Sequence, residues 1–143
     1  MSGQPESPRP LRILLVEDDA TSRQAVNSVA KTLGHQTYVA ENIRQALDLV
    51  VSENEVFDLL LSDISLPDAD GWELLRCLSE AGLRPRRAIA ISGRCSIQDL
   101  ARSQEAGFDH HFCKPVEMAV LEAILREAAG GSDAVIPLDP FEG

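Results

Sequence analysis

Hydrophobic residues along this chain follow two alternating patterns, short apolar runs and longer segments with an apolar stripe. The short runs have strand length and are apolar almost throughout, as expected for parallel strands covered on both faces. They comprise RILLV (12–16), TYVA (37–40), FDLLL (57–61), RAIAI (87–91) and HFC (111–113). We therefore predict five strands of one parallel sheet.

The segments that separate and follow these runs repeat apolar residues at the spacing of a helix. Apolar stripes predict helices at 25–33, 43–50, 74–78 and 120–128. A further helix, poor in apolar residues and therefore exposed, is predicted to begin after the N-cap Ser96; Asn42 is a second N-cap and Gly34 a C-cap. Five strands alternating with five helices predict an α/β fold, a doubly wound parallel sheet with helices on both faces.

Both ends of the chain have the composition of linkers. Residues 1–10 contain three prolines without apolar periodicity, and we expect a flexible leader there. Residues 130–143 are expected to form a C-terminal tail or linker. A single domain is thus predicted over residues 11–129.

Composition and charge exclude several classes of protein. A formal net charge of −10 argues against a nucleic-acid binder, and no apolar run approaches the length of a membrane span. The three cysteines, Cys77, Cys95 and Cys113, are scattered and lack CxxC spacing. We therefore expect neither a structural disulfide nor a zinc site, and a cytoplasmic location in a reducing compartment.

The polar residues with chemical potential gather at the carboxyl ends of the predicted strands, where open α/β sheets bind their ligands. Glu17 and Asp18 follow the first strand, Asp63 the third, Ser92 the fourth and Lys114 the fifth. If the first and third strands are neighbours, their ends lie about 4.8 Å apart. The three carboxylates would then share one pocket.

Three carboxylates in one pocket need compensating charge, or else one of them must hold a proton. Two of them about 5 Å apart repel by roughly 3 kcal/mol at an effective dielectric constant near 20. Lys114 supplies one positive charge, and a hard cation such as Mg²⁺ would supply the rest. A carboxylate beside Mg²⁺, a hydroxyl and a lysine is suited to accepting a phosphoryl group, because an Asp63 oxygen can attack phosphorus and form an acyl phosphate.

Four motifs in this order and spacing resemble the receiver domain of two-component response regulators: LLVEDD (14–19), LLLSDISLPDADGWELL (59–75), AIAISG (88–93) and FCKPV (112–116). The resemblance covers about residues 11–129. It implies a flavodoxin-like sheet with strand order 2-1-3-4-5. It also implies a signalling phosphoacceptor rather than an enzyme, served by a histidine kinase or histidine phosphotransferase and read by a downstream protein partner. A monomer or weak dimer is expected.

Matched position by position, the resemblance assigns a role to each candidate residue. Asp63 corresponds to the phosphorylated aspartate, Glu17 and Asp18 to the acidic pair that binds Mg²⁺, and Ser65 to the residue whose backbone carbonyl joins the metal. Ser92 corresponds to the switch hydroxyl and Lys114 to the family's lysine. Asp19 falls outside the acidic pair, and Asp68 and Asp70 are interpreted as turn and capping residues.

Two positions depart from the family pattern, and three alternatives remain. Gly93 stands where alanine is common, and His111 where a switch tyrosine or phenylalanine is usual, which puts an aromatic switch in doubt. A degenerate receiver acting as a docking module is the main alternative. A haloacid-dehalogenase-type phosphatase would need an acid at Ser65, and a flavodoxin-type flavin carrier a less acidic loop than EDDATS.

Overall fold

The predicted strands form one five-stranded parallel sheet in a computed structural model that describes residues 10–130. The strands are β1 (Arg12–Val16), β2 (Gln36–Ala40), β3 (Leu59–Ser62), β4 (Arg87–Ser92) and β5 (His110–Cys113). Their order is β2-β1-β3-β4-β5, so the predicted flavodoxin-like topology is confirmed. The expected leader and tail lie outside the described residues except for Pro10 and Gly130.

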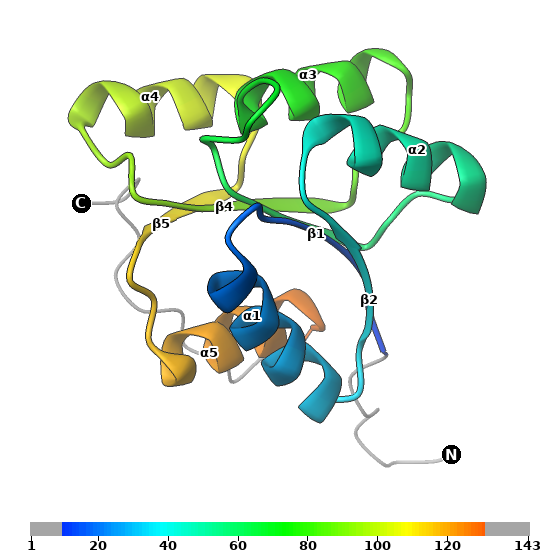
Figure 1. The fold of residues 1–143 in the computed structure, drawn as a ribbon, viewed down its shortest axis with the longest axis vertical. Helices are drawn as coiled ribbons and strands as arrows, with labels where there is room; N and C mark the ends of the chain where they lie inside the picture. The colour runs from blue at the N-terminus through cyan, green and yellow to red at the C-terminus, as the bar shows by residue number, and fades with distance from the viewer. Residues whose placement is uncertain (1–9, 131–143) are drawn as a thin grey trace.

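Helices cover both faces of the sheet (Figure 1). One face carries α1 (Ala20–Thr32) and α5 (Met118–Ala128). The other carries α2 (Ile43–Glu53), α3 (Gly71–Glu80) and α4 (Ile97–Ala106). Within the described part of the chain, no helix has the length and apolar character needed to cross a membrane.

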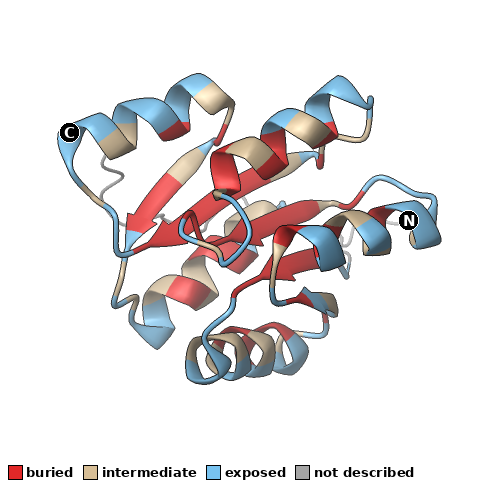
Figure 2. Ribbon diagram, turned by 45° about the horizontal axis from the view of Figure 1, so that its top comes forward, coloured by how far each residue is buried: buried red, intermediate tan, exposed pale blue. Residues whose placement is uncertain are grey.

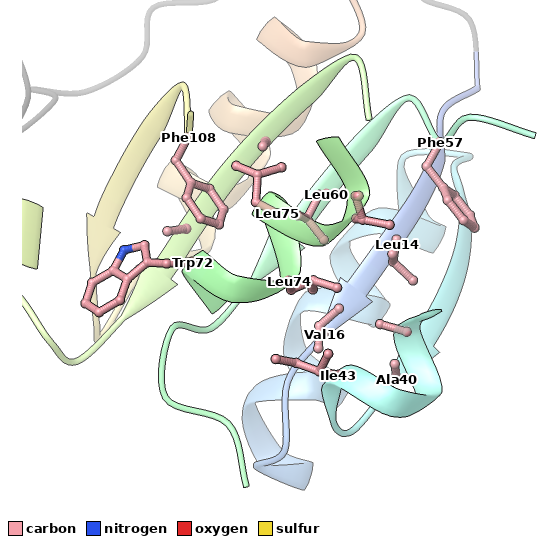
Figure 3. Packing of buried hydrophobic residues seen from close by; sticks show 14 of the residues in the cluster. Leu14, Val16, Ala40, Ile43, Phe57, Leu60, Trp72, Leu74, Leu75 and Phe108 are labelled. Carbon is pink, nitrogen blue, oxygen red and sulfur yellow. The ribbon is translucent and has the colours of Figure 1, made fainter. Parts of the chain in front are cut away.

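Two hydrophobic clusters, one on each face, hold the layers together, and the central strands β1, β3 and β4 between them are buried (Figure 2). Side chains alternate along β1: Leu14 and Val16 pack towards α2 and α3, whereas Ile13 and Leu15 pack towards α1 and α5. Trp72 and Phe108 lie in the cluster on the side of α2 and α3 (Figure 3). Burial on both faces explains why the strands are apolar almost throughout.

The predicted helix caps are confirmed. Asn42 accepts a hydrogen bond from Gln45 N, and Ser96 forms a capping box with Asp99. Gly34 follows α1 with φ +88°, a backbone conformation that favours glycine. The fourth helix is exposed as predicted, since Ser103 is the one residue of α4 that is buried.

The cysteine prediction was wrong, because Cys95 and Cys113 form a disulfide with Cα atoms 6.0 Å apart. Ser92 pairs with Cys113 across β4 and β5, and the loop that leaves β4 turns Cys95 back towards this pair. Register between strands, rather than spacing along the chain, brings the two sulfurs together. The cysteine pattern therefore gives no support for a reducing compartment. Cys77 is a free thiol.

Candidate functional site

The predicted acidic residues converge because β1 and β3 are neighbours in the sheet. Asp63 N donates to Val16 O at 2.9 Å, which places Asp63 beside Glu17 at the carboxyl ends of these strands. The carboxylates of Glu17, Asp18 and Asp63 each offer an oxygen, and these oxygens lie within 4.8 Å of one another. Glu17 and Asp63 are buried, whereas Asp18 is exposed. One side of the cluster is thus open to solvent.

Lys114 reaches this cluster from the end of β5. Its Nζ donates to Glu17 Oε1 at 2.6 Å and to Asp63 Oδ2 at 2.8 Å. The other Asp63 oxygen, Oδ1, accepts from Ile64 N at 2.7 Å and from Ser65 N at 3.2 Å. Both oxygens of the central aspartate are therefore held, one by an ammonium and one by backbone amides.

The charges in the site perturb its titrating groups. Burial raises the pKa of Glu17, and the hydrogen bonds from Lys114 and Asp19 N only partly offset this effect. Burial lowers the pKa of Lys114, but its hydrogen bonds to Asp63 and Glu17 outweigh burial, and the net pKa is raised. Lys114 therefore stays charged, and additional positive charge nearby would stabilise the ionised form of Glu17.

The donor set fits a hard divalent cation. Three carboxylates and one ammonium carry a net formal charge of −2, which one divalent ion would neutralise. Carboxylate oxygens are the ligands that Mg²⁺ prefers, and the exposed side at Asp18 leaves room for the waters that this ion retains. Ser65 is exposed beside Asp63, and the bridge between Ser65 and Asp70 holds its backbone at the rim of the site.

Ser92 is buried at the end of β4, on the same edge of the sheet. Its hydroxyl accepts a hydrogen bond from Arg94 N at 3.0 Å, and its carbonyl accepts one from Lys114 N at 2.9 Å. In this conformation the Ser92 oxygen is engaged by its own loop. Contact with a group on Asp63 would require that loop to rearrange.

A cavity of about 480 Å³ extends from the acidic cluster between the sheet and the helices α1 and α5. Glu17, Asp63 and Lys114 line its polar end. Apolar side chains such as Val26, Leu61 and Ile91 line the remainder. A low-dielectric wall behind the carboxylates strengthens their electrostatic interactions.

Residues 13–126 match the family model described as the response regulator receiver domain. The chain belongs to this family. The receiver domain is 30% identical over 130 residues to "Cell cycle response regulator CtrA" of Brucella ovis, covering 88% of this chain and 55% of the relative. It thus spans about half the length of the curated relatives it matches.

Solved structures share the fold. A CheY-like receiver domain protein from Methanospirillum hungatei JF-1 has a TM-score of 0.75 and 30% identity, over 86% of this chain and 96% of that chain. A two-component response regulator from Clostridium difficile has a TM-score of 0.77 and 20% identity, over 86% and 98% of the two chains. The second likeness concerns the fold alone.

Three acidic residues outside the cluster support its geometry. Asp19 is exposed and is the N-cap of α1, which it directly precedes. Asp70 caps α3, as interpreted from the sequence. Asp68 instead accepts from Ile43 N and Arg44 N at the start of α2, a long-range contact without a local sequence signal.

His111, at the position where the family usually has a switch aromatic, is fully buried on β5. Its Nδ1 lies 2.7 Å from Ser103 Oγ, which also accepts a hydrogen bond from Trp72 Nε1 at 2.7 Å. Its Nε2 lies 3.8 Å from Cys95 Sγ. The imidazole at the expected switch position therefore links α3, α4 and the loop after β4.

Proposed function

We propose that this receiver domain accepts a phosphoryl group on Asp63 from a histidine kinase or histidine phosphotransferase. The environment of Asp63 supports this proposal. Lys114 and two backbone amides hold its carboxylate, and Glu17 and Asp18 complete an acidic cluster around it. A surface aspartate needs none of these contacts, whereas a nucleophile that must meet phosphorus in one orientation does.

The residues divide the chemistry between them. An Asp63 oxygen attacks phosphorus as the bond between phosphorus and the donor nitrogen breaks, which yields an acyl phosphate and a free imidazole on the donor. Lys114, already 2.8 Å from Asp63 Oδ2, would follow the transferred oxygens and neutralise their charge. Glu17, Asp18, Asp63 and the Ser65 carbonyl would hold Mg²⁺, which supplies further positive charge to the phosphoryl oxygens.

Signalling then depends on the loop that leaves β4. A phosphoryl group on Asp63 offers new acceptor oxygens to Ser92 and Lys114, the residues that end β4 and precede α5. Ser92 would leave its contact with Arg94 N, and the loop would carry the start of α4 with it. Because α4 buries only Ser103, little packing opposes this shift. We propose that a downstream protein reads the face formed by α4, β5 and α5.

Incubation with acetyl phosphate and Mg²⁺ tests the phosphoacceptor. One base-labile phosphate should appear on the wild-type chain, measured by intact mass, and Asp63→Asn should abolish it. Asp48→Asn, at an exposed site on α2, is the matched control and should label like the wild type. Ser92→Ala should also label, since this residue acts after transfer. Undiminished labelling of Asp63→Asn would refute the assignment, and no labelling of the wild type would favour the docking module.

A further inference from the structure

The disulfide between Cys95 and Cys113 lies beside the site described above without belonging to it. Cys113 ends β5 and directly precedes Lys114, and Cys95 lies in the loop that follows Ser92. Cys95 Sγ is 3.4 Å from the carbonyl oxygen of Ser92. The bond therefore joins the two chain segments that carry the proposed switch hydroxyl and the proposed phosphate-binding lysine.

The two sulfurs differ in access to solvent. Cys113 is exposed and Cys95 is half-buried against His111, whose Nε2 lies 3.8 Å from Cys95 Sγ. Thiol–disulfide exchange needs one sulfur that an external reagent can reach and a second thiol close enough to resolve the mixed disulfide. Cys113 meets the first requirement, and Cys95 meets the second, with a Cα–Cα distance of 6.0 Å that is ordinary for a bridge.

We propose that Cys95 and Cys113 are a reversible redox-modification site that reacts with low-molecular-weight disulfides and thiols such as glutathione, and that its oxidation restrains the loop after β4. The effect on signalling rests on the proposed function of Asp63 and Ser92. The reactivity of the cysteine pair does not depend on that function.

The Cys113 thiolate attacks one sulfur of glutathione disulfide, the S–S bond of the reagent breaks, and one glutathione thiolate leaves. The Cys95 thiolate then attacks the Cys113 sulfur of the mixed disulfide and displaces the second glutathione. Two cysteine thiols lose two electrons and two protons, and glutathione disulfide gains them as two thiols.

The bridge restrains the movement that the proposed switch requires. Ser92 must exchange its contact with Arg94 N for a phosphoryl oxygen, which displaces the loop that contains Cys95. In the oxidised form this loop is tied to the end of β5, whereas in the reduced form only non-covalent contacts hold it. Oxidation should therefore leave phosphoryl acceptance at Asp63 in place and reduce the response of α4.

Trp72 offers a direct readout of that response. It is the single tryptophan of the chain, and its indole donates to Ser103 Oγ on α4, which in turn contacts His111 beside Cys95. The guanidinium groups of Arg94 and Arg102 also lie over its ring, at 4.9 and 4.1 Å from the centroid. Movement of α4 or of the loop after β4 changes the surroundings of this indole.

The first experiment equilibrates the full chain in glutathione buffers from fully reducing to fully oxidising and counts alkylated thiols by mass. We expect three labelled thiols in the reduced wild type and one in the oxidised form. Cys77→Ser, the matched control on α3, should still lose two labelled thiols on oxidation. Cys113→Ser and Cys95→Ser should not form the intramolecular bond. Three reactive thiols at every glutathione ratio would overturn the redox site.

The second experiment adds beryllofluoride with Mg²⁺ to the reduced and oxidised forms and records Trp72 emission. The oxidised form should show less than half of the reduced amplitude, with apparent beryllofluoride affinities within about threefold. Cys113→Ser should respond like the reduced form under both conditions. Equal amplitudes in the two forms would overturn the restraint on the loop. Failure of the reduced form to bind beryllofluoride would instead refute the proposed function and leave the thiol result standing.

Discussion

Gly71 is a position where the addition of one methyl group should disturb the backbone of Asp63, the proposed phosphoacceptor. It opens α3, and its backbone N donates to Ile64 O at 2.7 Å, so this helix start packs directly against the backbone that follows β3. A Cβ atom at residue 71 would lie 2.5 Å from the carbonyl oxygen of Asp63 and 3.2 Å from the Cα of Ile64. Both obstacles are backbone atoms, which no side-chain rotation can remove.

The cost of Gly71→Ala follows from these distances. Contacts of this kind prefer about 3.5–4.0 Å, so helix and strand must separate by roughly 1 Å. Forcing a methyl group into a packed interior costs about 1–3 kcal/mol. The higher helix propensity of alanine offsets less than about 1 kcal/mol of this cost. A net loss of about 1–2 kcal/mol should lower Tm by roughly 3–12 °C in a domain of this size.

Urea unfolding followed by circular dichroism measures this loss, and acetyl phosphate labelling measures its effect on Asp63. Gly93→Ala is the matched control, because a Cβ at residue 93 would meet no atom within 4 Å. Its stability should change by no more than about 0.5 kcal/mol. Labelling of Gly71→Ala should be slower than labelling of this control. Wild-type stability and labelling rate in Gly71→Ala would refute the close approach of α3 to the phosphoacceptor backbone.

Two further predictions concern the metal and pH. Asp18→Ala should weaken Mg²⁺ binding, measured by calorimetry, at least tenfold, which is about 1.4 kcal/mol. The control Asp19→Ala removes the α1 cap, so it should lower the free energy of unfolding by about 1 kcal/mol and leave Mg²⁺ affinity within twofold. Wild-type Mg²⁺ affinity in Asp18→Ala would place the ion elsewhere. Burial lowers the pKa of His35, whose Nδ1 accepts a hydrogen bond from Leu11 N. The stability that neutral His35 contributes is therefore fully present above about pH 6.5 and is lost as pH falls through the lowered pKa. Between pH 7.5 and 5.5 the Tm of the wild type should therefore fall more than that of His35→Gln, and parallel curves would exclude His35 as the cause.

Apolar patterning predicted the layers of this fold well because it reports burial directly. Runs such as RILLV and RAIAI became central strands, and the weak stripe of α4 became an exposed helix. The convergence of Glu17, Asp18 and Asp63 followed from their places at the ends of parallel strands. These features depend on periodicity and topology, which a single sequence contains.

Contacts set by register and helix packing could not be predicted in this way. Cys95 and Cys113 meet because β4 and β5 pair with Ser92 opposite Cys113, a register that the spacing of cysteines does not encode. Ser103 and His111 meet because α4 packs over β5 with its one buried side chain turned inward. Each depends on the position of one element against another to within a residue.

Asp68 connects the loop that follows Asp63 to one side of the domain, the side of α2. Its carboxylate, five residues after Asp63, accepts hydrogen bonds from Ile43 N and Arg44 N, at 3.0 and 3.1 Å, and so links the loop after β3 to α2. Burial raises the pKa of Asp68, but these amide hydrogen bonds outweigh it and the net pKa is lowered, so the fastening persists across the neutral range. A displacement caused by the proposed phosphorylation of Asp63 would thereby be directed away from α2 and towards α4. A protein that binds the domain in both phosphorylation states would therefore contact the half around α2. A protein that distinguishes the two states would contact the half around α4.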